Sequence, residues 1–227
     1  MNTATLRRVL PRPLLEHILH FECAIEHAVS RFAASLPDGA TVLDAGAGEG
    51  QYKHHFERQR YIGADLGIGD SDWNYRDLDV ISDLEALPLR EGSCDAVVNI
   101  VTLEHVREPA RVVCELARCL RPGGSLLLVV PHEWEEHQQP HDYFRYTRYG
   151  VTYLLKKAGL RDIRVEPVGG YFRLLARRLL NGIQFFPLLL KPFAMIAFCP
   201  AALVLPLLDG LDQKRNFTLG FICTARR

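Results

Sequence analysis

Three glycines at alternate positions follow a short apolar run in the first quarter of the chain. Gly46, Gly48 and Gly50 come directly after the segment Thr41-Val-Leu-Asp-Ala45. The apolar pair Val42-Leu43 predicts a buried strand, and the glycines allow the backbone to turn sharply and to pass close to a ligand without an intervening Cβ. In open α/β sheets such a turn lies at the carboxyl end of a strand, where nucleotides bind.

Two carboxylates accompany the glycine loop and indicate the kind of ligand. Asp65 ends a second strand-like segment, Tyr61-Ile-Gly-Ala-Asp65. It follows Asp44 by about twenty residues, the spacing at which an acid can accept both ribose hydroxyls of an adenosine-type cofactor. Asp44 stands just before the glycines, where a carboxylate would repel the pyrophosphate of a dinucleotide. It would suit a cationic ligand with an ammonium and a sulfonium, which S-adenosylmethionine offers.

From this loop onwards the chain resembles the class I S-adenosylmethionine-dependent methyltransferases, specifically the branch called type 11. The resemblance covers roughly residues 40 to 160. It implies a Rossmann-like α/β sheet of seven strands, mostly parallel with an antiparallel last strand and with helices on both faces. The matching segments are Asp83-Leu-Glu-Ala-Leu-Pro88, Cys94 to Ile100, Leu103-Glu-His-Val106, Glu115 to Gly124 with its Pro-Gly-Gly stop, and Ser125 to Pro131.

The resemblance also implies which residues hold the cofactor. Asp44 and the three glycines are expected at the methionine part, Asp65 at the ribose, and Asp83 at the adenine amine. Asn99 ends the fourth strand, where it either lines the cleft or caps the strand. An ordinary turn is the alternative for each glycine, and a solvated loop charge for each acid. The predicted cofactor residues are Asp44, Gly46, Gly48, Gly50, Asp65, Leu66, Asp83, Leu84 and Asn99.

Candidate residues for the acceptor side follow the fourth and fifth strands. Methyl transfer requires the nucleophile to be held about 3 Å from the methyl carbon, and a base helps if the nucleophile must lose a proton. His105 is either such a base or a helix N-terminal residue at the rim. The segment His132 to Tyr146 mixes imidazoles, carboxylates, Tyr and Arg, and part of it resembles a recurring type 11 segment. The predicted catalytic residues are His105, His137, His141 and Tyr143.

The same segment raises the question of a metal. His132, His137 and His141 are spaced five and four residues apart. That spacing suits zinc only when a defined third ligand converges, and Pro140 interrupts regular geometry. We therefore predict no metal site.

The elements that must position these residues form one expected domain. Apolar side chains at the helical period over residues 13–36 predict an amphipathic helix that leads into the sheet. By resemblance, Leu160 to Val168 is the sixth strand, and Asn216 to Ala225 is the seventh, inserted beside the fifth. The predicted layout is a single methyltransferase domain, 1–227, divided into a helical lead-in (1–39), a cofactor-binding core (40–168), an apolar insert (169–214) and the last strand (215–227).

The insert contains the most unusual segment of the chain. Phe185 to Leu208 is almost wholly apolar, and Lys191 is its only charge. A membrane span needs about 20 apolar residues, but four prolines interrupt this run, and a last strand that returns to the sheet is incompatible with a single crossing. Two alternatives remain. Short helices pack on the domain or on a partner, or a hairpin rests on a membrane with flanking Arg and Lys at anionic headgroups.

Composition suggests the partners and the compartment. Lys plus Arg and Asp plus Glu number 27 each, so the formal net charge is zero and we expect no nucleic-acid partner. The six cysteines form no CxxC pair, and the N-terminus lacks a secretory apolar region. We predict a cytoplasmic protein, or one at the inner face of a membrane through residues 185–208.

The predicted function is S-adenosylmethionine-dependent methyl transfer to a small-molecule, sugar or lipid-linked acceptor. Two alternatives are kept. One is a nicotinamide-dependent oxidoreductase, against which the glycine spacing and Asp44 argue. The other is a catalytically inactive, cofactor-binding, membrane-associated subunit. The pattern leaves open the oligomeric state and whether the nucleophile is O, N or C.

Overall fold

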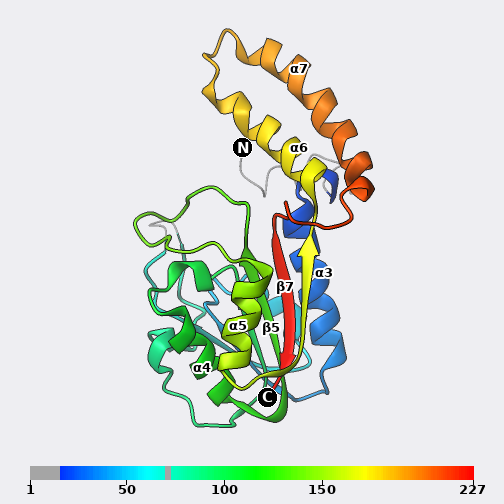
Figure 1. Cartoon of the computed structure of the whole chain (residues 1–227). Coiled ribbons are helices and arrows are strands. Elements are labelled where there is room, and N and C mark those ends of the chain that lie inside the picture. Colours follow the sequence, from blue (N-terminus) through cyan, green and yellow to red (C-terminus); the bar gives the residue numbers. More distant parts are fainter. Residues whose placement is uncertain (1–15, 70–72) are drawn as a thin grey trace. The chain divides into compact units, whose positions relative to one another are not determined.

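The computed structural model describes residues 16–69 and 73–227. Its contacts divide the chain into two compact units (Figure 1). We call Ile25–Glu166 with Phe221–Arg227 the sheet unit, and Met1–Ala24 with Pro167–Gly220 the helical unit. The single-domain layout expected above stays a prediction.

A seven-stranded sheet forms the centre of the sheet unit, in the order β3-β2-β1-β4-β5-β7-β6. The pairs β1–β2, β2–β3, β1–β4 and β4–β5 are parallel. Because β1 pairs with β2 on one side and β4 on the other, the order reverses there, which is where open α/β sheets bind their ligands. The strands are β1 Thr41–Ala45, β2 Arg60–Asp65, β3 Val80–Ile81, β4 Cys94–Ile100, β5 Leu120–Pro131, β6 Arg161–Val168 and β7 Gly220–Arg226.

The last strand confirms the predicted insertion beside the fifth. The N–H of Gly123 donates to the carbonyl of Arg227 at 2.8 Å, and the N–H of Arg227 donates to the carbonyl of Gly124 at 3.0 Å. The beginning of β5 therefore lies opposite the end of β7, so β7 is antiparallel to β5. The observed strand begins at Gly220, later than the predicted Asn216.

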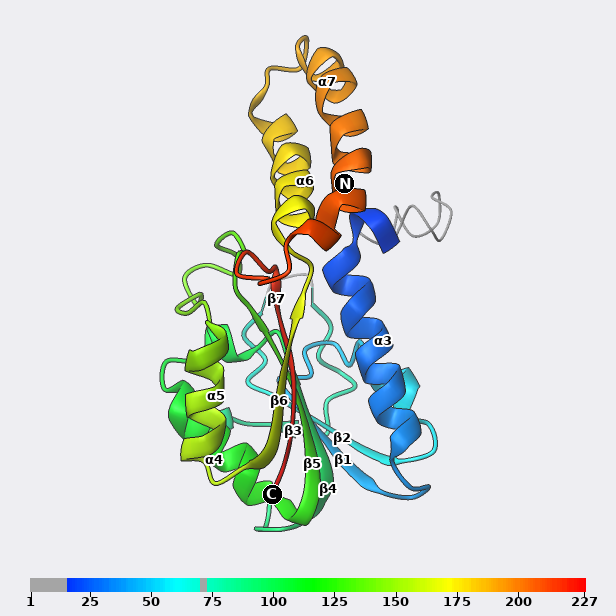
Figure 2. The ribbon, with the colours of Figure 1, turned by 45° about the vertical axis from the view of Figure 1, so that its right-hand side comes forward.

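Helices cover both faces of the sheet, as the resemblance implied. Figure 2 shows α4 (Pro109–Cys119) and α5 (Arg148–Lys157) on one face and the later turns of α3 (His20–Ser35) on the other. Pro109 begins α4, where its missing N–H costs no hydrogen bond. Leu116 of α4 and Leu155 of α5 are fully buried in the same core cluster as the strands. Residues 13–15 of the predicted first helix lie outside the described residues.

The apolar insert forms a helical hairpin within the helical unit. Helices α6 (Tyr171–Gly182) and α7 (Lys191–Val204) run side by side in both views. The short helices η4 (Ile183–Phe185) and η5 (Leu205–Leu211) complete the hairpin. The stretch Lys191–Leu211 is long and apolar enough to cross a membrane by length and composition, and 22% of its most apolar window is buried.

Polar contacts fix the base of the hairpin. Asp209 is buried, accepts the backbone N–H of Arg173 at 3.1 Å and pairs with the guanidinium of Arg215. Asp212 accepts the N–H of Tyr171 at 2.9 Å. These carboxylates satisfy N–H groups in the first turn of α6, which would otherwise have no partner. The farther part of the hairpin is exposed and apolar, with Phe185 82% and Leu189 86% exposed.

Candidate active site

The glycine loop adopts the backbone that its composition predicts. Gly46, Gly48 and Gly50 have φ values of 85°, 53° and 75°, a region that residues with a Cβ avoid. The N–H of Gly46 donates to the carbonyl of Ala64 at 2.7 Å, which anchors the loop to β2. The loop therefore presents bare backbone at the carboxyl end of β1.

Thr102 lies against the first glycine and was missed by the sequence analysis. A Cβ built on Gly46 would come within 2.3 Å of the Thr102 methyl carbon. The Thr102 hydroxyl lies 3.3 Å from the Gly46 carbonyl oxygen and 3.1 Å from that of Ile100. The residue before it, Val101, has φ 51°, which is a strained conformation for a β-branched side chain. This turn carries the chain from β4 across the glycine loop.

Asp65 holds the glycine loop as well as ending β2. Its two carboxylate oxygens accept the N–H groups of Gly48 at 3.0 Å and Gly67 at 2.8 Å. Each oxygen retains a second lone pair, and the side chain is only partly buried. Leu66 beside it is 44% exposed. The geometry leaves Asp65 able to accept hydroxyl donors, and the ribose contact stays a prediction.

Asp44 is a buried carboxyl group below the loop. It is 1% exposed, and the Tyr61 hydroxyl donates to its Oδ2 at 2.7 Å. Burial raises the pKa of Asp44 to about 7, nearby Asp65 adds to the increase, and the Tyr61 hydrogen bond opposes it. A cationic ligand would favour the charged form, which agrees with the predicted role at the methionine part without establishing it.

The predicted adenine pair separates into an exposed acid and a core residue. Asp83 accepts the N–H of Glu85 at 2.9 Å and caps η2 (Leu84–Ala86). Leu84 is 5% exposed and belongs to the main core cluster. Asp83 therefore has a local structural role, and its contact with adenine stays a prediction.

Asn99 joins two strands at the switch point. Its side-chain amide donates to the carbonyl of Ala45 at 2.6 Å, and the residue is fully buried. Its Oδ1 has no hydrogen-bond partner among residues 16–69 and 73–227. Asn99 therefore fixes β4 to the end of β1, directly before the glycine loop, rather than capping its own strand.

The acceptor side is built by the short helix η3 (Leu103–His105) and the loop from His132 to Tyr146. The Tyr146 hydroxyl donates to the carbonyl of Leu103 at 2.7 Å, and the N–H of Tyr143 donates to the carbonyl of Glu104 at 2.9 Å. These bonds fasten the loop to the helix that follows Thr102. The predicted acceptor residues therefore gather at the carboxyl ends of β4 and β5.

A bidentate ion pair organises the loop internally. Arg145 Nη1 and Nη2 donate to the two oxygens of Asp142 at 2.6 and 2.7 Å. Arg145 also donates to the carbonyls of Trp134 and Glu135. The Arg145 hydrogen bonds lower the pKa of Asp142 to about 2. One guanidinium thus ties both ends of the loop together.

The four predicted catalytic residues form two groups. The rings of His105 and His137 meet edge to face, with centroids 4.7 Å apart. His141 Nδ1 lies 3.1 Å from the Tyr143 hydroxyl, which also accepts from Arg107 Nε at 3.2 Å. His132, considered above only as a metal ligand, lies instead against the Phe221 ring.

Glu104 is the acceptor-side residue that the sequence analysis missed. It is 0% exposed, and burial raises its pKa to about 8, with its own N–H and Arg145 opposing the shift. Burial also lowers the pKa of the neighbouring His105. The sequence places this acid in a motif next to His105, but nothing in the local pattern indicates that the fold buries it.

Comparison with known proteins identifies the domain. Residues 43–128 match the family model Methyltransf_11, described as a methyltransferase domain. The tRNA (carboxymethyluridine(34)-5-O)-methyltransferase ALKBH8 of Mus musculus is 35% identical over 123 residues, 52% of this chain and 18% of that protein. The ubiquinone biosynthesis O-methyltransferase of Ralstonia nicotianae is 34% identical over 113 residues, 40% of this chain and 48% of that protein. The chain spans less than half the length of these relatives.

A solved structure supports the fold. The S-adenosylmethionine-dependent methyltransferase from Archaeoglobus fulgidus matches with a TM-score of 0.60 at 12% identity, covering 94% of this chain and 98% of that chain. At that identity the likeness speaks for the fold alone. The family match gives no support to the nicotinamide-dependent alternative.

The relatives correct one prediction. We expected no nucleic-acid partner because the charges balance, but relatives from Mus musculus, Macaca fascicularis, Arabidopsis thaliana and Xenopus tropicalis are named tRNA methyltransferases. That exclusion is wrong, because a net charge of zero reports neither local patches nor the chemistry of the site. Residues 43–128 match a methyltransferase domain, and the strand order and the glycine loop agree with the Rossmann-like fold of the class I S-adenosylmethionine-dependent methyltransferases.

Proposed function

We propose that this chain transfers the methyl group of S-adenosylmethionine to an oxygen acceptor. The observation that carries the proposal is the glycine loop at the switch point, whose N–H at Gly48 is held by the partly exposed Asp65. Asp44 supplies a buried carboxyl group that a cationic ligand would hold in its charged form. Oxygen is the favoured nucleophile because the mouse and Ralstonia relatives are both named as O-methyltransferases.

The chemistry requires alignment and a place for the acceptor proton. Methyl transfer is an in-line displacement, so most of the catalytic work is positioning. The turn at Thr102 lies against the glycine loop and leads from β4 to η3, which brings Glu104, His105 and the attached loop to the same end of the sheet. We assign the reacting end of the acceptor to the group Glu104, His105 and His137, and contacts with the rest of the acceptor to His141 and Tyr143 at the loop surface.

Calorimetry with S-adenosylhomocysteine tests cofactor binding directly. Asp65→Asn should weaken binding by on the order of 1–3 kcal/mol, because the ribose hydroxyls lose a charged acceptor. Asp95→Asn is the matched control. Asp95 also accepts one backbone N–H, from Thr41 at 2.7 Å, but it lies at the opposite end of the strands. Equal affinity in native protein and Asp65→Asn would remove Asp65 from the site.

The acceptor class is tested by following labelled methyl groups. Reaction with total RNA and with a lipid extract, each with and without ribonuclease, separates the two sources. Label that ribonuclease releases would support an RNA acceptor, in line with the tRNA methyltransferase names of several relatives. Label that partitions into organic solvent would support a lipid-linked acceptor.

The exposed hairpin favours the lipid-linked acceptor as a second candidate. Its large apolar side chains include Phe185, Leu188 and Leu189, all more than 80% exposed. Lys191, the only charge in the apolar run, follows these residues in the sequence and is a cation, which favours anionic headgroups. On this proposal the chain works at the inner face of a membrane and draws its acceptor from the bilayer.

Co-sedimentation with anionic vesicles tests that placement. The triple variant Phe185→Ser, Leu188→Ser, Leu189→Ser should lose binding. The double variant Ile81→Ser, Tyr149→Ser removes other strongly exposed apolar side chains from the sheet unit and should retain it. No sedimentation of native protein at low salt would end the lipid proposal and leave methyl transfer intact.

A further inference from the structure

One buried carboxylate and two imidazoles face one another where η3 meets the loop. Oε1 of Glu104 lies 3.7 Å from Nε2 of His105 and 3.8 Å from Nε2 of His137. All three atoms lie within 4.8 Å of one another. The carboxylate is fully buried, while the side chains of His105 and His137 are 11% and 27% exposed. The group is therefore closed on the carboxylate side and reached through His137.

The opposite ring nitrogens already have acceptors. His105 Nδ1 lies 2.7 Å from the carbonyl oxygen of His141. His137 Nδ1 lies 3.2 Å from the carbonyl oxygen of Glu135 and 3.4 Å from Asp142 Oδ2. Because a carbonyl can only accept, each Nδ1 must carry the proton in the neutral ring. Nε2 of each ring, 3.7 and 3.8 Å from Glu104 Oε1, then carries a lone pair.

No hydrogen bond closes the group. The separations of 3.7 and 3.8 Å are too long for one. Among the residues that the structure describes, both oxygens of Glu104 and Nε2 of His105 are buried without a hydrogen-bond partner. A cation at this point would supply the partner that the buried Glu104 carboxyl group and His105 Nε2 otherwise lack.

We propose that Glu104, His105 and His137 bind a divalent transition metal, with Zn²⁺ as the fitting ion. Two imidazoles and one carboxylate, with a fourth position left for water or substrate, are a ligand set of catalytic zinc sites. Zinc bonds of about 2.0–2.1 Å place tetrahedral ligand atoms about 3.3 Å apart. The two separations from Glu104 Oε1, 3.7 and 3.8 Å, exceed this value by about half an ångström, and the third pair of ligand atoms lies within 4.8 Å. The carbonyls and Asp142 behind the rings match the partners that orient metal-binding imidazoles.

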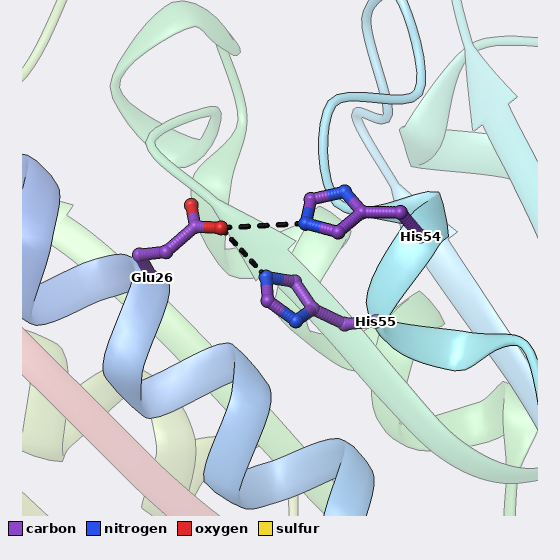
Figure 3. Close-up of side chains that lie close together, drawn as sticks. All are labelled: Glu26, His54 and His55. Atoms are coloured by element: carbon purple, nitrogen blue, oxygen red, sulfur yellow. Dashed lines mark hydrogen bonds and ion pairs between the residues drawn. The ribbon is translucent and has the colours of Figure 1, made fainter. Parts of the chain in front are cut away.

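A second cluster of the same residue types shows the contrast. Glu26 faces His54 and His55 from α3 (Figure 3). Oε1 of Glu26 lies 2.8 Å from His55 Nε2, a normal hydrogen bond, and the His54 side chain is 59% exposed. An ordinary ion pair explains this cluster, and it provides a matched control for the buried one.

Metal titration of the full chain after chelator treatment tests the proposal. Zn²⁺ measured by calorimetry and Co²⁺ measured by its visible absorption should each bind at one site per chain. Glu104→Gln keeps the shape but removes the charge, and His137→Ala alters a partly exposed ligand. Each substitution should weaken metal binding by about tenfold or more. The double variant His54→Ala, His55→Ala should bind the metal as the native chain does.

The titration contains no cofactor and no methyl acceptor, so its outcome does not depend on the proposed methyl transfer. An absence of heat and of Co²⁺ bands in the native chain would overturn the site. Metal affinities of Glu104→Gln and His137→Ala equal to that of the native chain would overturn it as well. Loss of binding only in the His54, His55 variant would move the metal to the exposed cluster. Circular dichroism of each variant separates lost ligands from lost folding.

Discussion

The hydroxyl of Tyr61 donates to the buried carboxylate of Asp44 at 2.7 Å, directly below the glycine loop. This single bond offsets part of the cost of burying Asp44, whose pKa stands at about 7 rather than 3.8. The fold thus keeps an acid in a place where it is destabilising unless a cation is near. Such strain is typical of functional sites.

The raised pKa of Asp44 sets a pH dependence of stability. The folded form retains the proton up to about pH 7, whereas the unfolded form loses it near 3.8. Stability from this group is therefore present below the lower value and lost as pH rises through the window. We expect Asp44→Asn to be more stable than native protein at pH 8 by on the order of 1–4 kcal/mol. The free energies of unfolding of the variant and of native protein should converge at pH 4. Urea unfolding at both pH values measures the difference.

The same variant should bind S-adenosylhomocysteine more weakly, because the buried charge is gone. Tyr61→Phe should act in the opposite direction on stability, costing about 1–3 kcal/mol at neutral pH because Asp44 loses its donor. If Asp44→Asn were no more stable than native protein at pH 8, the raised pKa would be refuted.

The first glycine of the loop should be less replaceable than the last. Gly46→Ala combines a φ of 85° with a Cβ only 2.3 Å from the Thr102 side chain. Gly50→Ala meets only the backbone strain, since its nearest neighbour, Lys53 Cβ, lies 4.0 Å away. Left-handed backbone costs about 1–2 kcal/mol for a residue with a Cβ, so Gly50→Ala should lose about that much and Gly46→Ala clearly more.

Adding Thr102→Ala to Gly46→Ala tests the cause. Removing the threonine methyl and hydroxyl opens the space for the new Cβ, so the double variant should be closer to Gly50→Ala in thermal unfolding. Additive losses in the double variant would show that Thr102 does not enforce the glycine.

Trp73 should report cofactor binding. A Cβ on Gly48 would lie 3.0 Å from Cζ3 of Trp73, so the indole covers the middle of the loop. A ligand that approaches this backbone must contact or move the ring. Because the chain has two tryptophans, the assignment is simple. S-adenosylhomocysteine should change the fluorescence emission of Trp134→Phe but not that of Trp73→Phe. If the ligand changed the emission of Trp73→Phe as much as that of native protein, Trp73 would not be the reporter.

The sequence predicts the parts of the site that local pattern encodes. The glycine loop and the ends of β1 and β2 follow from short local patterns, and the place of β7 follows from the family resemblance; the structure confirms them. The roles of Asp65 and Asn99 as backbone anchors were less accessible. Their partners, Gly48 and Ala45, lie in other strands or loops, and hydrogen bonds across the sheet leave no periodic trace.

Glu104 could not be predicted as a buried group for a related reason. Its neighbours come from segments far apart in the chain, His105 beside it and His137 in the loop after β5. The metal alternative considered from sequence used His132, His137 and His141, and the structure places His132 and His141 in other contacts. Spacing within one segment cannot reveal a ligand supplied by another.

Arg145 should matter for the acceptor and not for the cofactor. It pairs with Asp142 through both guanidinium nitrogens and holds the carbonyls of Trp134 and Glu135. Arg145→Ala would leave the 3% exposed side chain of Asp142 without its cation, which costs about 3–5 kcal/mol for a buried pair. The loop should loosen, kcat/KM for the methyl acceptor should fall, and affinity for S-adenosylhomocysteine should stay within a factor of about two.

Arg121→Ala provides the control for this last prediction. Arg121 also pairs with an aspartate, Asp95, at 2.7 Å, but its side chain is 54% exposed, so its loss should change stability by less than about 1 kcal/mol.

The ion pair between Arg145 and Asp142 should also make stability depend on pH. The pKa of Asp142, about 2, lies below the ordinary 3.8, so the pair stabilises the folded state above pH 3.8 and this stabilisation is lost as pH falls towards 2. Native protein and Arg145→Ala should therefore approach one another in stability only below pH 3.8, and a constant difference down to pH 2 would contradict the pairing.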